Sequence, residues 1–117
     1  MIAVDSSAII AIVRREPEAD RLEDVLIGAD RALMSAATYV ELGAVVDRGG
    51  SSAGSIELDE VLDSLGVSIV DSTPAQARIA RAAYAKFGRG SGHSAALNFG
   101  DCFAYAVARD AGVSLLF

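Results

Sequence analysis

Three acidic residues in this 117-residue chain interrupt segments that are otherwise apolar: Asp5, Glu41 and Asp101. Burying an unpaired carboxylate is costly, and three converging carboxylates repel one another unless a cation is bound between them. Mg²⁺ and Mn²⁺ prefer carboxylate and water oxygens and bridge readily to phosphates. If the three side chains converge, they indicate metal-assisted hydrolysis of a phosphodiester bond.

Each of these acids also fits a purely structural role. Asp5 or Ser6 fits the N-cap of a first helix, and Asp101 fits a first-turn acid that the helix dipole favours. Glu41 lies between two apolar residues and is harder to explain in this way, unless its helix edge is exposed. The spacing alone leaves both interpretations open.

The order of apolar segments determines where these acids can lie. Ligands of a parallel α/β sheet bind outside the carboxyl ends of its strands, and Asp5 ends the first predicted strand. Strands that alternate with helices predict an α/β fold, a three-layer α/β/α sandwich with a mostly parallel sheet. Strands are predicted at 2–5, 32–36, 67–70 and 113–117, helices at 8–13, 19–27, 38–47, 56–65, 74–87 and 101–110, and loops at 51–54 and 88–92.

Length and composition point to one folded domain, residues 1–117. Hydrophobic residues make up 52% of the chain and charged residues 22%, which excludes the composition of a disordered protein. No apolar run approaches the roughly 20 residues of a membrane-spanning helix, and no signal peptide is recognisable, so we expect a cytoplasmic protein. A single cysteine, Cys102, excludes an intrachain disulfide and a cysteine-based zinc site.

The net charge of −6 argues against a surface that binds nucleic acid everywhere. The charge is unevenly distributed, because residues 72–100 contain no Asp or Glu but include Arg78, Arg81, Lys86 and Arg89. This basic segment is a candidate face for an anionic ligand, although solvated arginines on a helix have the same appearance.

Three segments together resemble a known family. Residues 2–9 read Ile-Ala-Val-Asp-Ser-Ser-Ala-Ile, residues 39–41 read Tyr-Val-Glu, and residues 97–106 read Leu-Asn-Phe-Gly-Asp-Cys-Phe-Ala-Tyr-Ala. In this order they resemble the motifs of PIN domains, specifically the VapC-type ribonuclease toxins of bacterial toxin–antitoxin pairs. The resemblance spans nearly the whole chain.

The resemblance implies a set of functional residues. Asp5, Glu41 and Asp101 would surround one or two Mg²⁺ or Mn²⁺ ions and activate water against an RNA phosphate. Ser6, with Ser7 as its close competitor, would hydrogen-bond a carboxylate or a metal-bound water. Three further residues complete the implied site: Asn98 would orient the loop before Asp101, and Lys86 and Arg89 would contact the RNA backbone.

The resemblance also implies partners: an RNA substrate of the tRNA or rRNA class, a small cognate antitoxin protein and a second copy of the chain. Relatives of this type usually continue past a strand like 114–117 into a segment with a fourth carboxylate and a closing strand, so we expect the C-terminal end to be truncated. A catalytically impaired domain that acts by binding an antitoxin is the alternative. A phosphoacceptor role for Asp5 is disfavoured because Ser6 and Ser7 follow it.

The remaining conspicuous residues are given structural roles. We expect His93 to be an ordinary loop residue and Cys102 to be a small core residue. Tyr84, Phe87 and Phe103 are expected to pack in the core and not to stack on bases. The glycine-rich loop 88–92 lacks the Lys-Ser/Thr ending of a phosphate-binding P-loop.

Overall fold

A four-stranded parallel sheet forms the centre of the molecule. The computed structural model describes residues 1–49 and 54–117, with the side chains of 54–56 left out. The strands follow the order β3-β2-β1-β4 and are β1 (Ile2–Val4), β2 (Ala32–Ser35), β3 (Val67–Val70) and β4 (Ser114–Leu116). Ala3 of β1 pairs with Leu33 of β2 on one side and with Leu115 of β4 on the other, which fixes the register of β1 against both of its neighbours.

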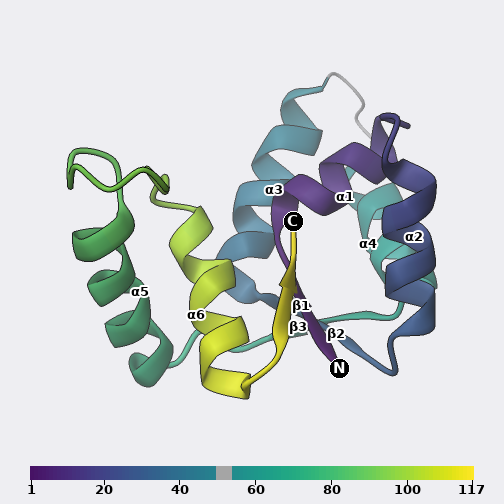
Figure 1. The fold of residues 1–117 in the computed structure, drawn as a ribbon. Helices are drawn as coiled ribbons and strands as arrows, with labels where there is room; N and C mark the ends of the chain where they lie inside the picture. The colour runs from purple at the N-terminus through teal and green to yellow at the C-terminus, as the bar shows by residue number, and fades with distance from the viewer. Residues whose placement is uncertain (50–53) are drawn as a thin grey trace.

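Helices cover both faces of this sheet. Figure 1 shows α5 and α6 on one side and the other four helices on the opposite side, so the predicted three-layer sandwich is confirmed. The helices are α1 (Ser6–Val13), α2 (Ala19–Gly28), α3 (Ala36–Arg48), α4 (Gly54–Ser64), α5 (Pro74–Phe87) and α6 (Asp101–Ala111). None of the helices in the described part of the chain is long and apolar enough to span a membrane.

Side chains of the strands alternate between two cores. Val4, Met34 and Leu116 point into the larger core, beneath α1 to α4. Ala3, Leu33 and Leu115 point to the other face, where α6 covers them. This period of two is the expected pattern for strands that are buried on both faces.

Three predicted helices begin two residues earlier in the structure. Helix α1 begins at Ser6 and not at residue 8, because the Asp5 side chain accepts from the Ser7 amide and caps the helix there. Helix α3 begins at Ala36 and not at residue 38, because the Ser35 hydroxyl accepts a hydrogen bond from the Ala37 amide at 3.2 Å and caps the helix there. Helix α4 begins at Gly54, which the sequence assigns to a loop. The rest of that predicted loop, residues 51–53, lies outside the described residues.

A narrow neck closes the loop between α5 and α6. The Leu97 amide donates to the Phe87 carbonyl at 2.8 Å, and the Arg89 amide donates to the Leu97 carbonyl at 2.9 Å. Gly88 and Leu97 thereby form an isolated β-bridge. The segment between them bulges outward as a mainly exposed loop, and Asn98 follows directly after the neck.

Candidate active site

Asp5 follows β1 directly and caps α1. Its Oδ2 atom accepts hydrogen bonds from the Ser7 amide at 3.3 Å and from the Ser7 hydroxyl at 2.8 Å. The side chain is only 5% exposed, and its Oδ1 atom is buried with no hydrogen-bond partner among the described residues. The capping role is therefore real, but it uses one oxygen of the carboxylate and leaves the other one available.

Glu41 is held between the first turns of two other helices. The buried Ser6 hydroxyl, on α1, donates to Glu41 Oε1 at 2.9 Å. On the other side the carboxylate lies against Gly100, where a Cβ atom would stand only 1.7 Å from Oε2. The acid on α3 therefore contacts both the helix that follows Asp5 and the residue that precedes Asp101.

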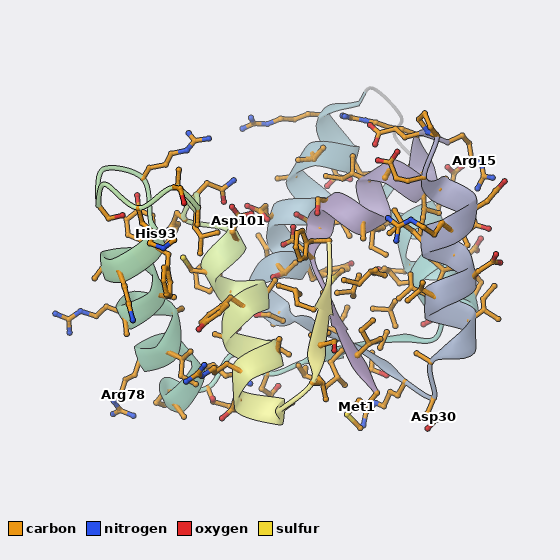
Figure 2. All side chains as sticks on the ribbon, in the orientation of Figure 1. Met1, Arg15, Asp30, Arg78, His93 and Asp101 are labelled. Atoms are coloured by element: carbon orange, nitrogen blue, oxygen red, sulfur yellow. The ribbon has the colours of Figure 1, made fainter. Side chains whose placement is uncertain are left out.

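Asp101 begins α6 and forms a reciprocal pair with Asn98. The Asn98 amide donates to Asp101 Oδ2 at 2.9 Å, and the Asp101 amide donates to Asn98 Oδ1 at 2.8 Å. Figure 2 shows Asp101 at the end of α6 that lies nearest the α5–α6 loop. Asn98 thus fixes both the start of the helix and one carboxylate oxygen, as a capping pair does.

Two of the three acids share one pocket. A cavity of about 340 Å³ lies at the carboxyl end of β1. Asp5 and Asp101 line it together with Ser7, Leu97, Tyr105, Leu115 and Phe117. Glu41 is tied to this pocket through Ser6 and Gly100. The structure therefore brings the three carboxylates that the sequence singled out to the same end of the sheet.

The donor chemistry at this edge fits a hard divalent cation. Carboxylate oxygens are the ligands that Mg²⁺ and Mn²⁺ prefer, and Asp5 Oδ1 is buried without a partner that satisfies it. Within residues 1–49 and 54–117, however, no group of three or more His, Cys, Asp or Glu side chains is arranged closely enough to hold a metal ion as it stands. Hydrogen bonds from Ser7, Ser6 and Asn98 engage the three carboxylates separately. The metal site stays a prediction.

The predicted RNA-contacting cations lie at the end of α5 and in the loop after it. Lys86 is exposed and its Nζ atom lies 5.2 Å from the centre of the Phe87 ring. Arg89 is exposed just outside the neck. Neither side chain forms an ion pair with any residue that the structure describes. Arg78 points outward near the opposite end of α5, away from Asp101 (Figure 2), so it lies apart from this group.

Two other residues lie where the sequence analysis places them. His93 is exposed in the loop, where its Nδ1 atom accepts from the Ala95 amide and its ring meets Phe87 edge-on at 4.8 Å. Cys102 is 1% exposed beneath α5. Burial raises the pKa of the Cys102 thiol above its ordinary value, and the charge of Asp101 adds to this effect.

Sequence reasoning missed one contribution to the site, Gly100, and one buried polar group near it, Thr38. Gly100 provides the close approach that Glu41 needs, and the position of a glycine directly before Asp101 is a signal that could have indicated it. Thr38 is fully buried one turn before Glu41, and its Oγ1 atom has no hydrogen-bond partner among the described residues. No pattern in the sequence distinguishes this threonine from an ordinary core residue.

Comparison with known proteins identifies the family to which this fold and these three acids belong. The sequence model of the PIN domain matches residues 2–117, so the chain belongs to the PIN-domain family. The chain is 50% identical over 113 residues to "VapC ribonuclease Mb0625" of Mycobacterium bovis and to "Ribonuclease VapC28" of Mycobacterium tuberculosis. Each alignment covers 97% of this chain and 85% of the relative. The resemblance to VapC-type proteins is therefore confirmed.

A solved structure shows the same fold. The crystal structure of Mycobacterium tuberculosis VapC20, described as a "Sarcin-Ricin loop cleaving toxin", matches with a TM-score of 0.70 at 16% sequence identity. The match covers 97% of this chain and 85% of that one. The two chains therefore share the same overall fold.

Proposed function

We propose that this protein is the toxin of a toxin–antitoxin pair and hydrolyses RNA phosphodiester bonds with the help of Mg²⁺ or Mn²⁺. The buried, unpartnered Oδ1 atom of Asp5, in the pocket that Asp101 also lines, is the observation that carries the proposal. A carboxylate oxygen without a partner is costly to bury, and a cation would remove that cost. The relatives that share half of their aligned residues with this chain are named ribonucleases.

Each residue of the site has a separate task in this proposal. Asp5, Glu41 and Asp101 would hold the ion. Once bound, a divalent ion supplies an activated water and neutralises charge on the phosphate. The Ser6 hydroxyl orients Glu41, and Asn98 orients Asp101.

The basic residues next to the site suit an RNA backbone. Lys86 and Arg89 are exposed and belong to a segment without acidic residues, so their charges are available to phosphates. We assign them to backbone contacts, which position the substrate without reading its sequence. We propose that the substrate is RNA of the tRNA or rRNA class and that the protein acts on it in the cytoplasm.

Cleavage of a mixed pool of tRNA and rRNA tests the proposal. The chain is incubated with the pool in Mg²⁺ or Mn²⁺, with excess chelator as one control and an Asp101→Asn variant as the other. The asparagine can still accept from the Asn98 amide, so the start of α6 is preserved. Discrete fragments that disappear in both controls are expected. Fragments that persist in both would contradict a metal-dependent activity of this site.

Two partners belong to the same proposal: a small antitoxin protein and a second copy of the chain. Light scattering during size exclusion measures the homodimer directly. If the chain binds an antitoxin but cleaves no RNA in either metal, it acts by binding, as the catalytically impaired alternative requires.

A further inference from the structure

The aromatic ring of Phe99 is exposed to solvent beside the candidate active site. The side chain is 68% exposed, although most rings of this size are buried in a folded domain. It stands two residues before Asp101 and directly before Gly100, which touches the Glu41 carboxylate. An exposed ring at this position adjoins the acids without contributing to the core.

Two other rings hold Phe99 in place. Phe103, one turn further along, lies 5.1 Å from Phe99 between ring centres, with the ring planes 76° apart. Tyr84 of α5 lies 6.1 Å away, with the planes 87° apart. Phe103 itself packs against the buried residues between α5 and α6. Both contacts are T-shaped, and the Phe99 ring keeps most of its surface open to solvent.

Apart from the three acids of the candidate site, the segment that carries this ring favours a polyanion. Residues 72–100 carry no acid, and the exposed cations Lys86 and Arg89 belong to the same segment. His93 in the loop and Asp101 on α6 lie toward the same end of the α5–α6 pair (Figure 2). Proteins that bind single-stranded nucleic acid combine these two features, an aromatic face for the bases and cations for the backbone.

We infer that Phe99 is a stacking platform for an unpaired base of the RNA substrate, next to the phosphate whose hydrolysis the three acids support. Tyr84 and Phe103 support the ring and do not stack themselves. The inference rests on the proposed ribonuclease activity and narrows it. A base that stacks on Phe99 has left its own helix, so the preferred substrate is unpaired at the cleavage point.

The platform is tested by the binding of fluorescein-labelled oligoadenylate RNA, measured by fluorescence anisotropy. Binding is measured in excess chelator, and again in Mn²⁺ with all variants made on the Asp101→Asn background. Phe99→Ala is expected to weaken binding by about 5-fold to 100-fold, the range that loss of one stacked base produces. Phe99→Trp and Phe99→Tyr keep an aromatic face and should bind like the parent, whereas Phe99→Leu should bind like Phe99→Ala. Ile27→Ala is the matched control, because Ile27 is 67% exposed on α2.

A second readout separates stacking from general stability. An oligoadenylate with one adenine replaced by 2-aminopurine should lose fluorescence when it binds the parent chain, because stacking on a ring quenches that base. The quenching should persist with Phe99→Tyr and be absent when Phe99→Ala is saturated with RNA. Thermal unfolding of every variant shows whether the fold is retained.

The failures of the two proposals are distinguishable. If the chain cleaves the RNA pool but Phe99→Ala binds oligoadenylate as tightly as the parent, the platform is wrong and the nuclease stands. The platform is also wrong if the parent does not bind oligoadenylate at millimolar concentration, or if Phe99→Ala weakens only the binding of a protein partner. If no RNA is bound or cleaved, both proposals are wrong.

Discussion

Gly100 and Glu41 approach each other so closely that a Cβ atom on Gly100 would stand 1.7 Å from Glu41 Oε2 and 2.5 Å from Cδ. This contact joins the middle of α3 to the start of α6. Gly100 has φ −65° and ψ −36°, an ordinary helical conformation, so the glycine is needed for space and not for its backbone freedom.

Gly100→Ala should therefore damage the site more than the fold. The methyl group must push aside the end of a flexible side chain, while alanine is favoured over glycine in a helical conformation by up to about 1 kcal/mol. We expect a melting temperature close to that of the parent and a loss of RNA cleavage of about tenfold or more, since small misplacements of catalytic groups are costly.

Gly43→Ala is the control for this substitution. Gly43 lies on the same helix as Glu41, and a Cβ atom there would meet nothing within 4 Å. This variant should be as active as the parent and slightly more stable. Full activity in Gly100→Ala would show that the position of Glu41 is unimportant.

Ser6 and Ser7 should respond differently to removal of their hydroxyl groups. Ser6→Ala removes the bond to Glu41 from a buried position and is expected to cost about 1 kcal/mol in the free energy of unfolding. Ser7→Ala removes a more exposed hydroxyl and leaves the amide bond to Asp5, so it should cost less. Urea unfolding of both variants measures the difference. If Ser7→Ala lowers the free energy of unfolding more than Ser6→Ala does, the Ser6–Glu41 bond is not the more important of the two.

Two substitutions of Asp5 separate its capping role from its role in metal binding. Asp5→Asn keeps a good N-cap, whereas Asp5→Ala loses it and should be less stable by about 0.5–2 kcal/mol without metal. In the parent chain, saturating Mn²⁺ should raise the melting temperature, with about 2.7 kcal/mol of stabilisation at 100 times the dissociation constant. Both variants should lose that increase. An unchanged Mn²⁺ response in Asp5→Asn would remove Asp5 from the metal site.

Cys102 should be nearly unreactive in the native protein. The thiol is buried and its pKa is raised, so a thiolate-specific disulfide reagent at pH 8 should react orders of magnitude more slowly than with the urea-unfolded chain. The folded state also binds the thiol proton more tightly than the unfolded state. Stability from this group is therefore complete below the ordinary thiol pKa and declines as the pH rises through the folded value. Rapid labelling without urea would contradict this burial.

Much of the fold was predictable from the sequence because local patterns and packing agree. Apolar strands such as 32–35 and capped helices such as 74–87 are recognisable from a few residues, and their alternation implies a parallel sheet. Helix α4 is the exception. Its body was predicted as the helix 56–65, but Gly54 is a weak helix former in a serine- and glycine-rich stretch, so the sequence assigns this first residue of the helix to a loop.

The candidate site was predictable in its members but not in its connections. Asp5, Glu41 and Asp101 are conspicuous because each is an acid among apolar residues. The direction of each side chain depends on packing between distant elements, which spacing does not encode. That Ser6 turns toward Glu41 while Ser7 turns back to Asp5 follows from where α1 begins and where α3 lies beside it.

The neck between Phe87, Arg89 and Leu97 separates the exposed loop 90–96 from the residues that hold Asp101. The backbone bonds at the neck fix Asn98 and therefore Asp101, whatever the loop outside them does. Lengthening a surface loop costs little conformational entropy. Insertions within 90–96 should therefore change the exposed loop beside the candidate site, while the three acids keep their positions. Related proteins built on this plan can diverge in what they recognise without redesigning the chemistry.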